Sequence, residues 1–595
     1  MRYISIALTA GLCLLDVSHA MAAEEHSERE SNPVSPARGI NHPLLRDTPL
    51  NNRAARNSQL QQRSADDPFR SFDGRNNNLI QPEMGATHIQ LRRVLPADYG
   101  DGIWTMAGTS RPSPRAVSNA VAAQTTLTPN PQRASDFLWQ WGQFLDHDID
   151  LTDGVDPVEP ADISIPLGDE FFDPFGTGTQ TMALNRSIYD KETGIDSPRQ
   201  QINEITAWID ASNVYGSDET RANALRTLAG DGKLKSSAGN LLPFNTDGLA
   251  NAGGDSPNLF LAGDVRANEQ SGLTVMHTLF MREHNRLAEQ IAQQNPELTG
   301  DEIYQKARQL VGAEMQAITY REYIPALLGE NALREYQGYQ DDVDASIMNS
   351  FSAAAYRYGH SALSPTMLRL DAAGNEIADG HLALRDAFFR PSRIIDEGGI
   401  APILRGLSQQ ICQRVDNRLI DDVRNFLFGP PGSGGFDLAA LNIQRGRDHG
   451  LPSYNEARVA MGLERAETFA DVTSNRLTRN RLQSVYSSVN DIDMWIGGLS
   501  EDPVEGSHVG ELFHTIMVEQ FEALRDGDRY WYTLTLTDEE QELIEGLTLA
   551  QIIRRNTQIG NELQADVFHV PGNQNGGGGN GGGGNGGGGN GGGGN

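Results

Sequence analysis

The 595-residue chain contains only two cysteines, Cys13 and Cys412. Cys13 lies in an N-terminal segment that we expect to be removed, so Cys412 would remain as a single thiol and an intramolecular disulfide is excluded. The sequence also lacks any Cys-x-x-Cys pair or His-Glu-x-x-His motif, which leaves structural and peptidase zinc without support. Another source of stability is therefore expected.

Basic residues are scarce relative to acidic ones. The chain has 48 Lys and Arg against 79 Asp and Glu, for a formal net charge of −31. Binding to phosphate backbones requires a basic face, so we expect no nucleic-acid partner, and anionic membrane surfaces are disfavoured for the same reason. The simplest interpretation is an acidic, soluble surface.

Long hydrophobic runs are absent except at the N-terminus. Residues 4–15 are largely apolar, follow Arg2, and precede the small-residue pattern Ala20-Met21-Ala22, which is typical of a cleaved signal peptide. No later stretch reaches about 18 apolar residues, so no membrane span is expected. We therefore predict that residues 1–22 are a signal peptide and that the protein is secreted and extracellular.

Four regions follow from the composition. After the signal peptide, residues 23–75 are polar and form a flexible or surface-wrapped leader, whereas residues 572–595 form a disordered Gly/Asn-rich tail that ends in four Gly-Gly-Gly-Gly-Asn units. Between them, residues 76–571 are expected to form a single large, mainly α domain with few short strands. Apolar spacing typical of helices occurs at 134–150, 273–293, 301–323, 347–359 and 477–489.

Glycine-rich segments do not match nucleotide-binding loops. Gly232-Lys233 is followed by Leu234, where such a loop requires Ser or Thr, and the cluster at 432–435 lacks the third glycine of a dinucleotide fingerprint. No Gly-x-Ser-x-Gly hydrolase motif occurs. His277 and His284 could share one helix face as metal ligands, but a buried, hydrogen-bonded role is the simpler interpretation.

Three polar residues stand out within an apolar helical pattern. Gln143, Asp146 and His147 lie three and four residues apart and would share one face of a helix. Burying them without partners would be costly, so they either bind a ligand or bridge structural elements. Spacing alone leaves both interpretations open.

Further segments make the pattern specific. In order, the chain contains Arg111-Pro-Ser-Pro-Arg115, Trp139-Gln-Trp-Gly-Gln143-Phe-Leu-Asp146-His147-Asp148, Asp210-Ala-Ser-Asn-Val-Tyr-Gly216, Ala262-Gly-Asp-Val-Arg266-Ala-Asn-Glu269-Gln270, Tyr356-Arg357-Tyr-Gly-His360 and Leu441-Asn442-Ile-Gln-Arg445. This series resembles the animal-type haem peroxidases of the peroxidase-cyclooxygenase superfamily, nearest to its peroxidasin branch. The resemblance spans roughly 76–560. Because the extra modules and cysteines of animal members are missing, we expect a secreted microbial relative.

The resemblance implies a role for each matching residue around haem b. His360 would be the proximal iron ligand, with Asn442 accepting its other N–H, while Arg357 and Arg445 would pair with the haem propionates. On the opposite face, His147 would transfer the peroxide proton at a pKa near its ordinary value of about 6.5. Arg266 would stabilise negative charge on the breaking O–O bond, and Gln143 would order water and the incoming halide.

Two carboxylates match the positions that this family esterifies to haem methyl groups. These are Asp146 and Glu269, and we expect both ester links to form during peroxide turnover. Gln270 occupies the position where some relatives carry a methionine that forms a sulfonium link. The resemblance therefore favours bromide, iodide or thiocyanate over chloride.

A calcium site is also implied. The stretch Thr206-Ala-Trp208-Ile-Asp210-Ala-Ser212 resembles the calcium loop of the family, and Asp148 would complete it. Oxygen ligands of this kind suit a hard cation, although turns produce the same composition without a metal. Because Asp148 adjoins His147, the ion would hold the distal helix in place.

The predicted function is a secreted haem peroxidase that reduces hydrogen peroxide and oxidises halides, pseudohalides or phenolic donors through an oxyferryl state, and we expect a monomer. Two alternatives are a fatty-acid oxygenase of the same superfamily and a non-catalytic matrix or adhesion protein. The oxygenase branch carries a tyrosine three residues before the proximal histidine. Here that residue is Arg357, and Tyr356 and Tyr358 are expected to point elsewhere on a helix.

Overall fold

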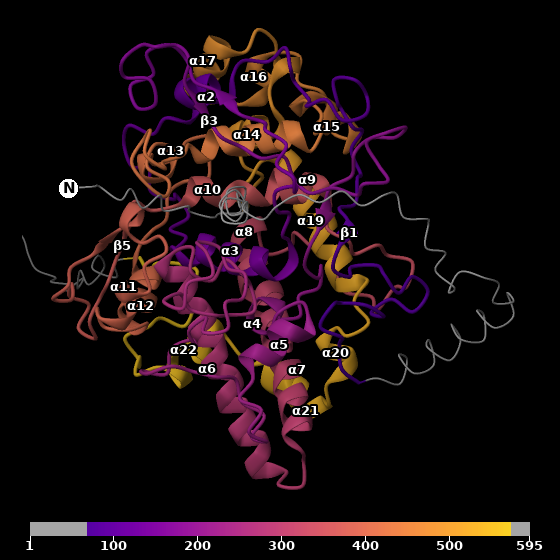
Figure 1. Cartoon of the computed structure of the whole chain (residues 1–595), viewed down its shortest axis with the longest axis vertical. Helices are drawn as coiled ribbons and strands as arrows, with labels where there is room; N and C mark the ends of the chain where they lie inside the picture. The colour runs from indigo at the N-terminus through magenta and orange to yellow at the C-terminus, as the bar shows by residue number, and fades with distance from the viewer. Residues whose placement is uncertain (1–67, 573–595) are drawn as a thin grey trace, which may run out of the picture.

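Two long helices, α6 (Ser271–Gln294) and α7 (Gly300–Ile318), form an antiparallel pair at the lower end of the molecule in Figure 1. They belong to a computed structural model that describes residues 68–572. The turn between them ends at Thr299, whose side chain forms a capping box with Glu302 at the start of α7. Both helices agree with the apolar spacing at 273–293 and 301–323, the latter ending in the π-helical turn η2 (Thr319–Tyr323).

The centre of the domain is α3 (Phe137–Ile149), which is buried on nearly all sides. It contacts α6, the short helix α10 (Gly359–Ala362) and α12 (Ala401–Gln409). Aromatic side chains fill these contacts, for example Trp141 and Phe144 against Phe280 of α6. A helix that is buried on nearly all sides belongs in a core, which is where α3 lies in Figure 1.

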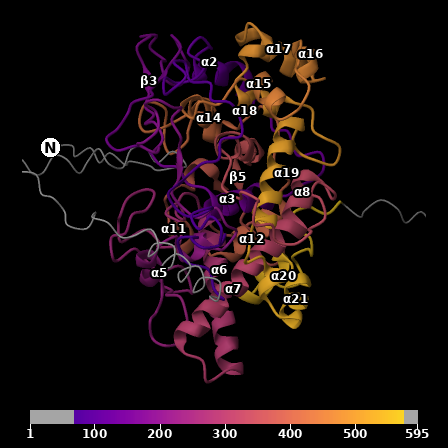
Figure 2. The same ribbon diagram turned by 90° about the vertical axis from the view of Figure 1, so that its right-hand side faces the viewer.

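The pattern at 347–359 is the main departure from the expected helices. It breaks into α9 (Asn349–Ala353) and the 3₁₀ turn η3 (Ala355–Tyr358), and α10 follows. The break occurs at Ala354, whose φ of −141° and ψ of −67° are not helical. Figure 2 shows α19 (Glu511–Asp526) along one side of the domain, where it contacts η3.

Strands are short and few, as predicted. Three antiparallel pairs join β1 (Ile89–Gln90) to β4 (Ile202–Asn203), β2 (Ile163–Ser164) to β3 (Thr181–Met182), and β5 (Thr366–Met367) to β6 (Leu382–Ala383). The pattern at 477–489 becomes α17 (Arg476–Val485) and η5 (Val489–Asp491). The other helical segments are α2 (Pro114–Val117), η1 (Ser118–Ala122), α4 (Ser212–Tyr215), α5 (Glu219–Leu225), α8 (Ile324–Leu328), η4 (Leu384–Asp386), α11 (Ser392–Ile395), α13 (Asp421–Arg424), α14 (Leu438–Asp448), α15 (Tyr454–Ala460), α16 (Phe469–Val472), α18 (Met494–Ser500), α20 (Tyr532–Thr535), α21 (Asp538–Glu545) and α22 (Leu549–Asn556).

The mainly helical fold class is thus confirmed. Within residues 68–572, no helix is long and apolar enough to cross a membrane. The expected signal peptide, most of the leader and nearly all of the tail lie outside the described residues, as does Cys13. Cys412 is buried with a free thiol.

Candidate active site

The C-terminal half of α3 brings Gln143, Asp146 and His147 together, as their spacing predicts. The close packing of this helix depends on Gly142, because a Cβ there would lie only 2.9 Å from the hydroxyl of Tyr323. His147 is fully buried. Gln143 and Asp146 on the same face are partly exposed and line a pocket, so the polar face of α3 points into that pocket.

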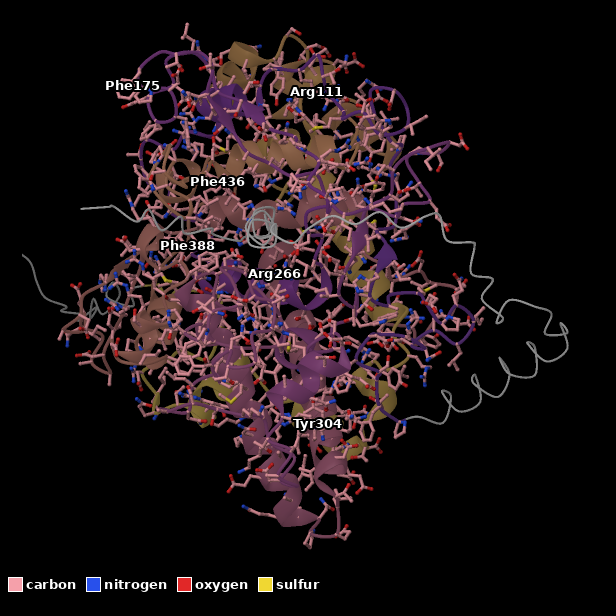
Figure 3. All side chains as sticks on the ribbon, in the orientation of Figure 1. Arg111, Phe175, Arg266, Tyr304, Phe388 and Phe436 are labelled. Atoms are coloured by element: carbon pink, nitrogen blue, oxygen red, sulfur yellow. The ribbon has the colours of Figure 1, made fainter. Side chains whose placement is uncertain are left out.

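Arg266 approaches this face from the loop before α6, and Figure 3 shows it near the middle of the molecule. Its guanidinium binds the carboxylate of Asp264 through Nε–Oδ1 and Nη2–Oδ2 contacts, each of 2.9 Å. Oδ1 of Asp264 also lies 3.4 Å from Nδ1 of His147. The role of Asp264 was not predicted from the sequence. An acidic residue two positions before Arg266, in an otherwise apolar segment, could have indicated a partner for this arginine.

The electrostatics of His147 differ from the expected near-neutral titration. Burial, followed by the nearby positive charge of Arg266, lowers the pKa of His147 well below 6.5. The prediction of a pKa near the ordinary value is therefore wrong for this structure. The imidazole is neutral, however, and a neutral ring is what a proton acceptor requires.

The opposite wall carries His360 at the start of α10. Burial lowers the pKa of His360 to about 3, so this ring is also neutral and able to bind a metal. Its Nδ1 lies 2.7 Å from Nδ2 of Asn442 on α14, and Oδ1 of Asn442 accepts a hydrogen bond from Arg357 at 3.3 Å. The Asn442 amide thus faces the imidazole with its nitrogen, whereas the expected arrangement has the amide oxygen accepting from the ring. The oxygen instead accepts the hydrogen bond from the Arg357 guanidinium.

A pocket separates these two walls. It is lined on the α3 side by Gln143, Asp146 and Glu269, and on the other side by His360. It contains about 790 Å³ of atom-free space, part of which is open to solvent. Arg357 and Gln270 also line it, and apolar contacts complete it: Leu363, Leu384, Phe388, Val423, Leu427 and Leu438. Phe388 is labelled in Figure 3. The combination of an apolar wall, one neutral imidazole and a few polar groups suits a large flat cofactor.

The two carboxyl groups of the pocket both have raised pKa values. Burial raises the pKa of Asp146 to about 7 and that of Glu269 to about 8, in each case against the attraction of Arg266. Oε1 of Glu269 accepts a hydrogen bond from Gln143, whereas the buried Oε2 has no hydrogen-bond partner among the described residues. An orphaned carboxyl oxygen in the pocket wall fits a covalent bond to a cofactor.

Tyr356 and Tyr358 require a correction. The assumption of a regular helix places both away from the site, but both line the pocket. The reason is that η3 is a 3₁₀ turn, which rotates successive side chains differently from an α-helix. Their hydroxyls lie 3.0 and 2.7 Å from that of Tyr323, forming a buried phenol cluster.

Arg445 lies outside the pocket lining. Its Nη1 donates to the Ser187 hydroxyl at 2.7 Å and contacts Oδ2 of Asp448 at 3.3 Å. The side chain is buried in this network because Asp448 supplies its counter-charge. Its expected contact with a haem propionate therefore gains no support from the geometry.

The expected calcium residues converge behind α3. The Asp148 carboxylate accepts hydrogen bonds from the backbone of Asp210 and the hydroxyl of Ser212, while Thr206 donates to Oδ1 of Asp210. Burial raises the pKa of both carboxyl groups, and the charge of Asp210 raises that of Asp148 further. Oδ2 of Asp210 is buried without a hydrogen-bond partner, which suits a cation, although the indole of Trp208 is bonded to the Gly74 carbonyl and only its main chain could take part.

The two helix histidines have different environments. His284 contacts the Tyr215 hydroxyl at 2.8 Å and the Gly232 carbonyl at 2.9 Å, whereas His277 packs edge-on against Phe144. Both are buried. No cluster of three or more His, Cys, Asp or Glu side chains suited to a metal occurs between residues 68 and 572.

Comparison with known proteins agrees with this geometry. Residues 69–568 match the family model described as animal haem peroxidase. The match begins seven residues before the expected domain boundary at 76, in a segment where Arg70 pairs with Asp528 at 2.5 Å. The segment at the end of the expected leader is therefore packed against the domain.

Curated relatives and solved structures extend the match. The chain is 39% identical over 560 residues to the peroxidasin homolog of Homo sapiens, covering 84% of this chain but only 37% of that protein. Peroxinectin A of Dictyostelium discoideum is 36% identical, with 84% of this chain and 95% of that protein covered. The structure of peroxidase A from D. discoideum superposes with a TM-score of 0.78 at 34% identity, covering 84% of this chain and 99% of that one. An Arabidopsis thaliana fatty acid alpha-dioxygenase shares the fold, at a TM-score of 0.72, 20% identity, and coverage of 85% and 84%.

Proposed function

The chain belongs to the animal haem peroxidase family, and on this premise we propose that it is a secreted haem peroxidase that uses hydrogen peroxide to oxidise bromide, iodide, thiocyanate or phenolic donors. The observation that carries the proposal is the pocket between the α3 wall and His360. Both imidazoles that the chemistry needs are buried and neutral. The chain spans about a third of the length of its peroxidasin relatives, so the proposal covers only the peroxidase reaction and not their other activities.

The pocket residues fit haem b. His360 would bind the iron through Nε2, which requires the ring proton on Nδ1. The Asn442 amide would then turn its oxygen toward the ring to accept that proton, as amides do when the neighbouring donor changes. Arg357 would face a propionate, and Asp146 and Glu269 would form the two ester links. Haem, when bound, supplies the redox chemistry of the reaction.

On the α3 side, the protein handles protons and charge. His147 would accept a proton from hydrogen peroxide and return it to the departing oxygen. Arg266, held by Asp264, would stabilise the negative charge that develops on the peroxide oxygen. Gln143 already donates to Glu269, and it would also orient water or the anionic donor. Because all three groups are fixed before the reaction, little reorganisation is needed.

The donor preference follows from Gln270. Its amide caps the start of α6 by accepting from Gly272 and donates to Gln140 and Gln143. A glutamine provides no sulfur for a sulfonium link to haem. We therefore expect bromide, iodide and thiocyanate to be oxidised more readily than chloride.

Calcium would occupy the site formed by Asp148, Thr206, Trp208, Asp210 and Ser212, with Trp208 contributing its carbonyl. Two buried carboxyl groups and the unbonded Oδ2 of Asp210 support this assignment. The ion would stabilise the end of α3, where His147 lies, in a domain without a disulfide.

One set of measurements tests the proposal. Purified protein loaded with haem is assayed for oxidation of chloride, bromide, iodide, thiocyanate and guaiacol at steady state. A Soret band and peroxide-dependent turnover are expected. Oxygen uptake with a fatty acid in the absence of peroxide would instead favour the oxygenase alternative. A folded protein that binds no haem would favour the non-catalytic alternative.

A further inference from the structure

A basic groove lies away from the active-site pocket, between the second half of α6, the loop at 233–240 and the end of α22. Helices α6 and α22 are in contact and lie side by side in Figure 1. The groove shares no lining residue with the active-site pocket. Its lining carries five cationic side chains, Lys233, Lys235, Arg282, Arg286 and Arg555.

This charge is unusual for the chain. The whole protein is strongly acidic, yet Glu289 is the only acidic residue in the groove lining. Glu283 lies behind the lining, and its side chain is fully buried. Burial alone would raise the pKa of Glu283. The hydrogen bond and charge of Arg286, together with the charge of Arg555, outweigh this effect and lower the pKa. Glu314 is a second buried carboxyl group, 2.5 Å from Arg555, and burial beside Glu283 raises its pKa well above the ordinary value. Counting Glu283 and Glu289 as anions, Glu314 as neutral and the five lining side chains as cations leaves a local charge of +3.

Two of the arginines are held in place before any ligand arrives. Arg286 donates to both carboxylate oxygens of Glu283, at 2.6 and 3.0 Å, and Arg555 contacts the same carboxylate at 2.6 Å. The side chains of Arg286 and Arg555 remain 30% and 31% exposed to solvent, respectively. Lys233 is 33% exposed and lies 3.4 Å from Glu289 at the rim. Little side-chain entropy would be lost on binding, because the arginines are already ordered.

Arg282 fixes the walls of the groove. Its guanidinium donates to the carbonyl oxygens of Asn240, Gly239 and Asn556, at 2.7, 3.0 and 3.2 Å. It therefore ties the 233–240 loop and the end of α22 to α6. The groove is therefore formed by three chain segments whose separation Arg282 fixes.

The lining also indicates the kind of ligand. It contains no aromatic residue, and its neutral members are mostly hydroxyl and amide side chains, such as Thr227, Asn285 and Gln558. The groove is open to solvent and its lining comes from three chain segments, which suits an extended ligand better than a single small anion. Charge together with hydroxyl and amide hydrogen bonding suits a chain of sugars bearing sulfate or carboxylate groups.

We propose that this groove binds an acidic polysaccharide, with the five cations contacting its anionic groups and the amides and hydroxyls contacting its sugar hydroxyls. A nucleic acid fits less well, because single strands bind through stacking on aromatic side chains, which the lining lacks.

The test measures binding directly, independently of peroxidase activity. Haem-loaded full-length protein is titrated with dextran sulfate, alginate and neutral dextran, for example by fluorescence anisotropy of labelled polymers, at several salt concentrations. Binding to one or both acidic polymers, none to neutral dextran, and a steep loss of affinity with salt are expected. The sulfated and the carboxylated polymer together show which anionic group is preferred.

A charge-reversal variant locates the site. Lys233→Glu combined with Lys235→Glu is expected to weaken binding by about tenfold or more, since two of the five contacts become repulsive. The matched control, Lys191→Glu combined with Arg476→Glu, changes the net charge equally at exposed positions outside the groove and should bind normally. Lys235→Glu alone provides a milder second variant, and unchanged thermal unfolding and peroxide turnover show that each variant is folded.

Three results would overturn the proposal. The first is absence of binding to either acidic polymer at low salt. The second is equal weakening by the groove variant and the control, which would mean that only overall charge matters. The third is tighter binding of a single-stranded oligonucleotide than of either polysaccharide, which would assign the groove to a nucleic acid.

Discussion

The carboxylate of Asp264 holds the guanidinium of Arg266 in a two-point contact, with both N–O distances at 2.9 Å. The same carboxylate reaches Nδ1 of His147 at 3.4 Å. The guanidinium of Arg266 keeps the pKa of Asp264 well below its ordinary value despite burial, so the group is an anion in the core. One buried charge therefore positions both side chains that would act on peroxide.

Replacing Arg266 with Gln is expected to slow the reaction of the haem-loaded enzyme with peroxide by about 10²–10³-fold, because a preorganised cation at the breaking bond is lost. Stopped-flow absorbance in the Soret region measures this rate. The control is Arg321→Gln, which removes an exposed arginine. An unchanged rate in R266Q would show that this guanidinium does not act on peroxide.

Asn442→Asp is expected to make the iron reduction potential more negative. A carboxylate next to Nδ1 of His360 strengthens the hydrogen bond from the ring and makes the imidazole more electron-rich. A spectroelectrochemical titration of the ferric/ferrous couple measures the shift. Asn480→Asp adds the same charge at an exposed position and should leave the potential unchanged. Equal potentials in both variants would contradict contact between Asn442 and the iron ligand.

Glu269→Gln is expected to remove one covalent link to haem, because an amide does not form the ester. After peroxide turnover, wild-type haem should resist extraction with acidified acetone, and the combined Asp146→Asn and Glu269→Gln variant should release it fully. Mass spectrometry of proteolytic fragments identifies the remaining link in each single variant. Free release of haem from the turned-over wild type would refute both esters.

Chelation is expected to destabilise the protein. Removing calcium with EGTA would leave the buried Asp148 and Asp210 carboxyl groups without a cation to offset their desolvation. Differential scanning calorimetry should show a lower Tm, which added calcium restores. The Asp210→Ala variant should contain no calcium by elemental analysis, and EGTA should not change its Tm. Asp342→Ala, at an exposed position, should behave as wild type. Calcium-free protein with an unaltered Tm would exclude the site.

Asp136 should make stability depend on pH. It is buried at the start of α3, accepts a hydrogen bond from Ser364, and burial raises its pKa to about 7. The folded state therefore keeps a proton that the unfolded chain releases above about pH 4, so stability is lost as pH rises from about 4 to 7. The contribution is of the order of 4 kcal/mol, at about 1.4 kcal/mol per pKa unit.

Asp136→Asn isolates this effect, because the amide stays neutral and still accepts from Ser364. Denaturant unfolding at pH 5 and pH 8 should show a much smaller loss of stability in D136N than in wild type. Asp342→Asn, at an exposed position, serves as the control. Parallel pH profiles for D136N and wild type would show that Asp136 is ionised in the folded protein.

Much of the site follows from local pattern. The spacing of Gln143, Asp146 and His147 predicted a shared helix face, and the ordered motifs predicted that His360 and Asn442 lie together. Long helices such as α6 were predicted because apolar residues recur with the helical period over many turns. Short segments were less predictable, because one non-helical residue, Ala354, is enough to turn Tyr356 and Tyr358 into the pocket.

The amino-acid order by itself determined the helical framework, the family and the residue types available for chemistry, because these depend on periodicity and on motifs that are read along the chain. Tertiary structure alone decided which charges meet. It placed Asp264 between His147 and Arg266, tied Arg445 to Asp448, and gathered five cations of an acidic protein into one groove. Ionisation depends on burial and on distances between groups far apart in the sequence, and folding alone sets both quantities.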